Sequence, residues 1–187
     1  RTQRDGLPAL PSAYPDEFFE DLTLFLPHLE VAKFAGGEPF LVRGHHVVWD
    51  LLIDGGHRPE VSVVTNGTQW NDRIASVVDH LSMKVVVSVD SVDRDRFEAI
   101  RVGARFDEVI AHLDHFVEVA REVEISHCLM RDTWSGFPDL LRFADDRGLG
   151  VNVSTVMEPE AQSLHRLPID DLRAVVDGLR RRTPILA

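Results

Sequence analysis

The sequence predicts an α/β fold with a parallel sheet, and three observations carry this prediction. Short runs of apolar and β-branched residues alternate along the chain with longer segments of helical periodicity. About five such runs occur, each separated from the next by a helical segment, so we expect parallel strands joined by right-handed crossovers. The chain has 187 residues and no internal repeat, which indicates one domain with a substantial core. This pattern leaves two architectures open, a doubly wound sheet and a barrel.

The strands are identified by their apolar runs. Residues 84–89 form the clearest one, because a nearly continuous β-branched run predicts a strand buried on both faces. The further strands are expected at residues 31–34, 61–64, 123–130 and 151–156.

Amphipathic spacing and terminating residues mark the helices. After an irregular lead-in over residues 1–15, the first helix has Asp16 as its expected N-cap and reaches Leu26, with Pro27 near its end. A long helical region, residues 94–121, is expected to break near Gly103. The other expected helices are the segment around 47–52 that Gly55 and Gly56 close, and residues 70–81, 137–147 and 169–179.

Composition limits the classes of function. Apolar residues make up 44% of the chain, yet no apolar run approaches the ~20 residues of a membrane span, and no signal peptide pattern is present. We therefore expect a cytoplasmic protein without a membrane partner. The net charge of −11 argues against a nucleic-acid partner, because phosphate neutralisation needs clustered Lys and Arg. The single cysteine, Cys128, excludes a disulfide framework.

The first candidate site lies in residues 31–42, VAKFAGGEPFLV, where an expected strand runs into a turn. Gly36 and Gly37 have no Cβ, so the backbone can adopt positive φ and approach a ligand closely. Glu38 places a carboxylate at the mouth of the turn, where it can pair with an ammonium group or accept a hydrogen bond from a hydroxyl. Pro39 stiffens the exit into the next helix. An ordinary strand-to-helix turn that needs glycine for its geometry alone is the alternative.

A second candidate site is the end of the Val-rich strand. Ser88 and Asp90 are two residues apart and are expected to point to the same face of the sheet. Ligands of parallel α/β folds bind at the carboxyl ends of the strands, where both residues lie. Buried polar groups need partners, so backbone amides, or an N-cap role for Asp90, are the alternative to a ligand.

Gly36, Gly37, Glu38 and Pro39 resemble the GGEP motif of the radical S-adenosylmethionine (radical SAM) enzymes, which lines the site of the methionine amino group. Two further motifs follow in the family's order. The turn Thr65-Asn66-Gly67-Thr68 is similar to its TNG turn, and Val87-Ser88-Val89-Asp90-Ser91 is similar to its strand end of serine, a hydrophobic residue and aspartate. The similarity runs from about Tyr14 onward and is closest to the subgroup with SPASM or twitch extensions.

The resemblance implies a set of cofactor-binding residues. Gly36–Pro39 would hold the methionine end of SAM, and Ser88 and Asp90 would contact the ribose side. The full set that the resemblance implies is Gly36, Gly37, Glu38, Pro39, Thr65, Asn66, Ser88 and Asp90.

The resemblance also selects one architecture. Radical SAM cores are partial (β/α)6 barrels of parallel strands, with the loop that binds the [4Fe–4S] cluster after the first strand. Residues 1–187 are then expected to form one core domain with strands two to six, lacking the first strand and the CxxxCxxC loop. Because Cys128 alone cannot hold a [4Fe–4S] cluster, we expect a piece of a longer enzyme with cluster ligands upstream. The histidines form no convincing metal site, so no metal ligands are expected in this chain.

The chemistry that the resemblance implies is reductive cleavage of SAM to a 5′-deoxyadenosyl radical, which abstracts a hydrogen atom from a substrate carbon. The expected substrate is a small molecule, a sugar or a peptide, in natural-product, sugar or peptide modification. The expected electron donor is a protein such as flavodoxin or ferredoxin. A cluster-free, degenerate binding module on the same barrel is an alternative from another class.

Cys128 supports a further enzymatic alternative, a radical epimerase of sugar or peptide carbons. Strand alternation places Cys128 on the same face as Glu124 and Ser126, with Ile125 and His127 on the other. If the second face packs on helices, the thiol points into the barrel, where it can donate a hydrogen atom. A lone cysteine is more often a small buried hydrophobic residue.

Overall fold

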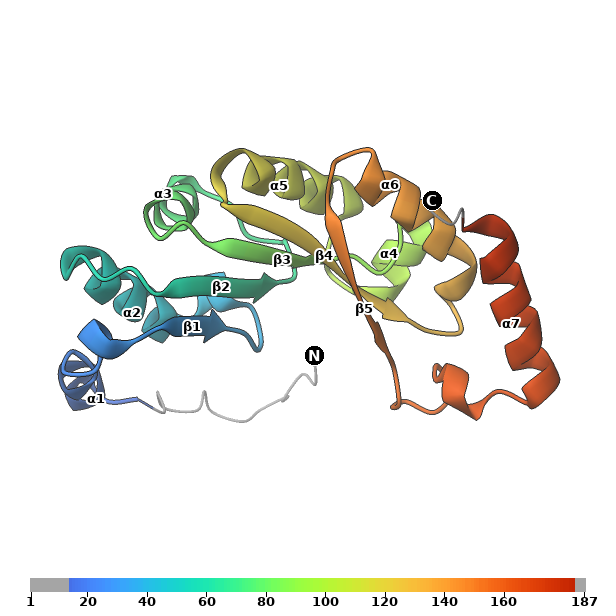
Figure 1. Cartoon of the computed structure of the whole chain (residues 1–187), viewed down its shortest axis with the longest axis horizontal. Coiled ribbons are helices and arrows are strands. Elements are labelled where there is room, and N and C mark those ends of the chain that lie inside the picture. Colours follow the sequence, from blue (N-terminus) through green and yellow to red (C-terminus); the bar gives the residue numbers. More distant parts are fainter. Residues whose placement is uncertain (1–13, 184–187) are drawn as a thin grey trace.

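The structure, a computed structural model, describes residues 14–183, and Figure 1 shows their arrangement. Five parallel strands form one sheet in the order β1-β2-β3-β4-β5, so each strand lies beside its neighbours in sequence. Doubly wound sheets instead reverse their strand order at a switch point. The sequential order confirms the predicted partial (β/α) barrel. The strands are β1 (Val31–Phe34), β2 (Glu60–Thr65), β3 (Lys84–Ser88), β4 (Glu122–Leu129) and β5 (Gly150–Thr155).

Helices connect the strands, and in Figure 1 the helices α3, α5 and α6 lie along one side of the sheet, with α7 beyond β5. Right-handed crossovers between sequential strands place connecting helices on one face of a sheet. The α-helices are α1 (Asp16–Leu22), α2 (Arg43–Asp54), α3 (Asp72–His80), α4 (Arg94–Ile100), α5 (Phe106–Val119), α6 (Phe137–Asp145) and α7 (Ile169–Arg182). Short 3₁₀ turns are η1 (Leu26–His28), η2 (Pro39–Leu41), η3 (Trp134–Gly136) and η4 (Leu164–Arg166). No helix within residues 14–183 is long and apolar enough to cross a membrane.

The hydrophobic core lies between these helices and one face of the sheet. Val85 and Val87 of β3 are fully buried there, whereas Val86 between them is only partly buried. The expectation that this strand is buried on both faces is therefore wrong. Its β-branched run reflects strand propensity, and within the described residues the second face of the sheet stays partly open.

The first helix is shorter than the sequence pattern predicts. It ends at Leu22, and the separate turn η1 begins at Leu26 with Pro27 inside it, because a proline ring cannot continue an α-helix. Pro15 occupies the N-cap position and Asp16 lies in the first turn, so the N-cap prediction for Asp16 is wrong. The predicted break near Gly103 is confirmed, since α4 ends at Ile100 and α5 begins at Phe106.

Candidate functional site

The carboxyl ends of the first strands bring the predicted residues to one edge of the sheet. The register pairs Phe34 with Val63 and Thr65 with Val87. The turns that follow β1 and β2 and the end of β3 therefore succeed one another along this edge. In parallel α/β folds this is the edge where ligands bind.

The glycine turn after β1 has the backbone conformation that the sequence predicts. Gly36 has a φ of 87° and Gly37 a φ of 58°. Both values lie in the left-handed region, where the backbone of a residue with a Cβ is strained. A Cβ built on either glycine would meet no described atom within 4 Å. The glycines are thus required by backbone conformation, and the space beside this turn is free to receive a ligand.

Glu38 ties this turn to the end of β2. Its buried carboxylate accepts hydrogen bonds at Oε1 from Thr65 Oγ1 (2.8 Å) and Phe40 N (3.3 Å), and at Oε2 from Asn66 N (2.9 Å). None of the three donors carries a charge, and no described cation pairs with this carboxylate. A carboxylate has about four acceptor positions, so Glu38 retains one for a ligand.

The turn after β2 is held by its own side chains. Thr65 Oγ1 accepts from Gly67 N (3.0 Å), and Asn66 Oδ1 accepts from Thr68 N (2.9 Å). A Cβ on Gly67, at a φ of 73°, would lie 2.9 Å from a methyl carbon of Val109, so only glycine fits there. Glu38, Thr65 and Asn66 therefore form one rigid hydrogen-bonded cluster.

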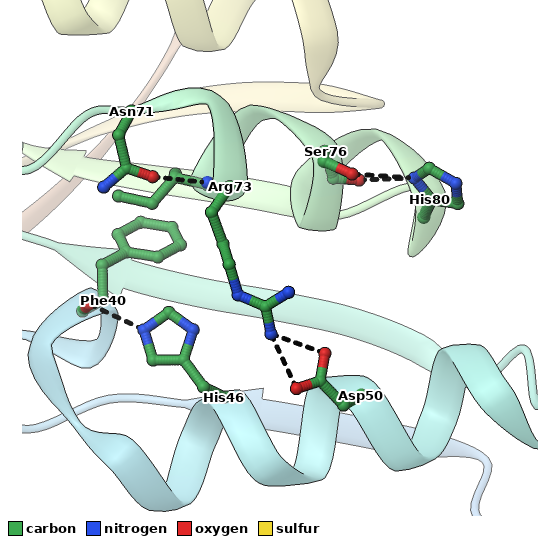
Figure 2. A network of polar contacts seen from close by, with 8 residues as sticks. Phe40, His46, Asp50, Asn71, Arg73, Ser76 and His80 are labelled. Carbon is green, nitrogen blue, oxygen red and sulfur yellow. Dashed lines mark hydrogen bonds and ion pairs between the residues drawn. The ribbon is translucent and has the colours of Figure 1, made fainter.

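Two histidines of α2 support the glycine turn from behind, a role that sequence reasoning missed. His45 Nδ1 donates to the Pro39 carbonyl oxygen (3.2 Å), and His46 Nε2 donates to that of Phe40 (2.9 Å), as Figure 2 shows for His46. Burial lowers the pKa of His45, which favours the neutral ring. The only sequence signal is a six-residue spacing from each carbonyl, which has no meaning before the helix is placed.

Figure 2 also shows how α2 is held against α3. Arg73 of α3 donates two hydrogen bonds to the Asp50 carboxylate of α2, at 2.6 and 2.7 Å. Asn71 caps α3 by accepting from Ile74 N at 3.0 Å. The Arg73–Asp50 pair thus joins α3 to α2, the helix that carries the two histidines.

Ser88 and Asp90 have different surroundings. Ser88 is half-buried and lies opposite Ser126 in the β3–β4 register, whereas Asp90 lies past the end of β3 and is buried. Asp90 Oδ1 accepts from Cys128 N (2.9 Å), and Oδ2 pairs with Arg101 (2.8 Å). Sequence reasoning missed Arg101, which lies eleven residues further on, past the end of α4.

The N-cap alternative for Asp90 is wrong. Asp93 caps α4 by accepting a hydrogen bond from Arg96 N at 2.9 Å. Backbone and guanidinium partners therefore satisfy Asp90, while the cap of the following helix comes from the next aspartate.

The predicted alternation of faces along β4 is confirmed from Glu124 to Cys128, whereas Met130, assigned to the Cys128 face, lies past the end of the strand and is buried. Ile125 and His127 are fully buried on the helix side, whereas Cys128 is only partly buried, with its Sγ 3.4 Å from Ser154 Oγ of β5. Burial lowers the pKa of His127, and its ring stacks on that of Phe137. His127 is thus a neutral core residue, while the Cys128 thiol belongs to the open face.

The turn that follows β4 is closed by Thr133. Its buried hydroxyl donates to the Cys128 carbonyl oxygen (2.9 Å) and accepts from Met130 N (2.9 Å). Thr133 therefore makes the contacts that close this turn.

The open face of the sheet carries a charged group near its amino-terminal end. Lys84 Nζ lies 3.0 Å from Glu122 and 2.8 Å from Glu124. Hydrogen bonds to these carboxylates raise the pKa of Lys84, and the bond from Lys84 lowers the pKa of Glu124. This charged group lies at the end of the sheet opposite the one that carries the candidate site.

The described part of the chain shows no metal centre of its own. Across residues 14–183 no three His, Cys, Asp or Glu side chains gather closely enough to hold a metal ion. Cys128 is the single cysteine of the whole sequence, so these residues do not fit a [4Fe–4S] cluster.

Curated proteins similar in sequence are named GTP 3′,8-cyclase. The one from Mesorhizobium japonicum is 30% identical over 154 residues, which cover 78% of this chain and 46% of that protein. GTP 3′,8-cyclase 2 of Mycobacterium tuberculosis is 30% identical over 179 residues, 91% of this chain and 49% of that protein. The chain thus spans about half the length of these relatives. No family model matches it.

Solved structures share the fold at low sequence identity. SuiB of Streptococcus suis bound to S-adenosylmethionine has a TM-score of 0.65 at 16% identity, over 92% of this chain and 41% of that chain. The structure named anSMEcpe with bound AdoMet has a TM-score of 0.64 at 16% identity, over 78% of this chain and 42% of that chain. Both likenesses extend over most of the described sheet and helices.

Proposed function

This chain belongs to the radical SAM superfamily, and we propose from that premise that it is the SAM-binding core of an enzyme that abstracts a hydrogen atom from a substrate carbon. The cofactors of the superfamily are SAM and a [4Fe–4S] cluster. The observation that carries the proposal is the open glycine turn, which is joined through Glu38 to Thr65 and Asn66 at the carboxyl edge of a partial barrel.

The described residues fit the methionine end of SAM. Gly36 and Gly37 leave open space beside a backbone that only glycine adopts without strain. Glu38 provides a negative charge with no described counter-ion and with one acceptor position left for an ammonium group. Further along the edge, half-buried Ser88 can exchange hydrogen bonds with ribose hydroxyls.

The cluster is assigned to another part of the protein. Cys128 alone cannot supply three thiolate ligands, and the relatives are about twice as long as this chain. When bound, the cluster and SAM together supply the radical that removes a hydrogen atom. The part played by this chain is to hold SAM and to line the side of the barrel on which the substrate binds.

The proposal is tested by comparing two glycine variants of the complete protein. Gly37→Ala and Gly56→Ala each put a side chain at positive φ, with no described atom within 4 Å of the new Cβ. Both should lose about 1–2 kcal/mol of unfolding free energy through backbone strain. Only Gly37→Ala should weaken SAM binding, at least ~10-fold, because its methyl group would occupy the space for the ligand.

The readouts are SAM affinity by calorimetry and 5′-deoxyadenosine formed by the reconstituted, dithionite-reduced protein under anaerobic conditions. The wild type should form 5′-deoxyadenosine only when reduced. SAM binding without any cleavage would favour the cluster-free binding module. Equal loss of affinity in the two variants would remove the glycine turn from the SAM site.

We also propose a substrate class and a subgroup of the superfamily, and the names of similar proteins bear on both. The relatives are named for a reaction of GTP, and one SuiB structure is bound to the precursor peptide SuiA. We propose a small-molecule, sugar or peptide substrate, a SPASM- or twitch-type extension outside this chain, and a flavodoxin- or ferredoxin-like electron donor.

A radical epimerase is a second candidate function, which the partly exposed Cys128 thiol favours. In this reaction the S–H bond breaks and a C–H bond forms on the substrate radical. The sulfur is left as a thiyl radical, which the electron donor reduces with uptake of a proton.

Cys128→Ala tests this candidate. The variant should still form 5′-deoxyadenosine but should lose epimerised product at least ~100-fold, as measured by solvent-deuterium incorporation into the substrate. Ser154→Ala, which removes only the neighbouring hydroxyl, is the matched control and should retain product. Unchanged product formation by Cys128→Ala would end the donor hypothesis.

A further inference from the structure

A cavity within residues 14–183 lies outside the SAM-binding residues. It has a volume of about 500 Å³ and lies between α4 and the connection from β4 to η3. This volume is within the range of small-molecule sites. The lining residues are Arg96, Ala99, Ile100, Arg131, Asp132 and Ser135. The two segments follow the carboxyl ends of β3 and β4, the end of the sheet that carries the candidate site.

Two arginines in this cavity have no carboxylate partner among the described residues. Most arginines in the described part of the chain pair with an acid, as Arg73 does with Asp50 and Arg94 with Asp107. Within residues 14–183, neither Arg96 nor Arg131 takes part in an ion pair, although the chain carries a net charge of −11. Unpaired guanidinium groups brought together in an acidic protein indicate a site for an anion that comes from outside.

Both guanidinium groups are held in place by uncharged acceptors. Arg96 Nη1 donates to Ser135 Oγ at 3.2 Å, and Arg131 Nε donates to the Ser163 carbonyl oxygen at 3.1 Å. Each group has five N–H donors, so most of them remain for a ligand. Fixing the side chains in advance lowers the entropy that binding costs.

The other residues that line the cavity indicate the chemistry of the rest of the ligand. Ala99 and Ile100 offer apolar surface, whereas Asp132, which accepts from Gln162 Nε2 at 2.6 Å, contributes one opposing negative charge. We propose that this cavity binds the phosphate or carboxylate group of a small organic molecule, with Arg96 and Arg131 as its anion-binding residues. The planar fork of each guanidinium matches both groups.

The proposal is tested by calorimetric titration of the complete protein with inorganic tripolyphosphate and, separately, with tricarballylate. At least one probe should bind saturably, and the probe that binds tighter identifies the ligand as phosphate or carboxylate. Arg96→Gln and Arg131→Gln should each weaken that binding about 10-fold or more. Asp132→Asn should tighten it about 3-fold, because the opposing charge is removed. A merely structural role for these residues would not produce that gain.

Arg173→Gln is the matched control, because Arg173 is an exposed arginine of α7 that pairs with Asp170 in its own helix. It should change probe affinity less than 2-fold. Arg96→Lys keeps the charge but loses the planar fork, so its probe affinity should lie between those of the wild type and Arg96→Gln. If Arg131→Gln fails to fold, the two Arg96 variants test the proposal. Saturating SAM should leave the probe bound. The proposal is overturned if neither probe binds, if the arginine variants behave like the control, or if SAM displaces the probe.

Discussion

Glu38→Ala is expected to lower the free energy of unfolding by about 3 kcal/mol and to abolish measurable SAM binding. The substitution leaves the Thr65 hydroxyl and the N–H groups of Asn66 and Phe40 without their buried acceptor. Hydrogen bonds to a charged acceptor contribute ~1.5–3 kcal/mol each, and water entering the vacated space offsets part of the loss. Urea unfolding and calorimetric titration with SAM measure the two effects.

Glu38→Gln separates the structural part from the ligand-binding part. The amide oxygen still accepts from Thr65 or Asn66, so we expect a loss of about 1–2 kcal/mol in unfolding free energy. The negative charge is gone, and the affinity for SAM should fall at least ~10-fold. Wild-type affinity in this variant would show that the carboxylate only braces the turn.

Asp90→Ala is expected to cost about 3–5 kcal/mol of unfolding free energy. Asp90 is buried, pairs with Arg101 at 2.8 Å and accepts from Cys128 N at 2.9 Å, so one carboxylate joins the ends of β3, α4 and β4. Removing one partner of a buried ion pair leaves the other charge uncompensated, which is the expensive case. The midpoint of urea unfolding, at an unchanged slope, measures the loss.

Two comparisons establish the cause of this effect. Asp170→Ala breaks an exposed pair within α7 and should change unfolding free energy by about 0.5 kcal/mol or less. The double variant of Asp90→Ala with Arg101→Ala should be less destabilised than the sum of the two single variants. Additive losses would show that the Asp90–Arg101 pair contributes little and that the contact with Cys128 N dominates.

The sequence predicted the parts of the site that depend on the local backbone. Positive φ at Gly36 and Gly37 and the alternation along β4 follow from residue type and strand period, which act over a few residues. The β-branched run of residues 84–89 correctly predicts a strand but wrongly predicts that both of its faces are buried. Strand propensity is local, whereas burial depends on which elements cover each face.

Sequence reasoning could not predict the partners of the functional side chains. Glu38 meets Thr65 across 27 residues of chain, and Asp90 meets Cys128 across 38. His45 and His46 gain their role only when α2 folds back on the glycine turn. The partner of a single charged or polar residue cannot be inferred from the sequence around it.

The sequence by itself determined the succession of parallel strands, the glycine conformations and the order of the motifs along one edge. Tertiary structure alone decided that Glu38 is braced by β2, that Asp90 is paired with Arg101, and that Arg96 and Arg131 share a cavity. The physical reason is the distance along the chain over which each interaction acts. Backbone dihedral preferences and strand alternation act between neighbours, whereas charge pairing, burial and cavities arise from the packing of distant segments.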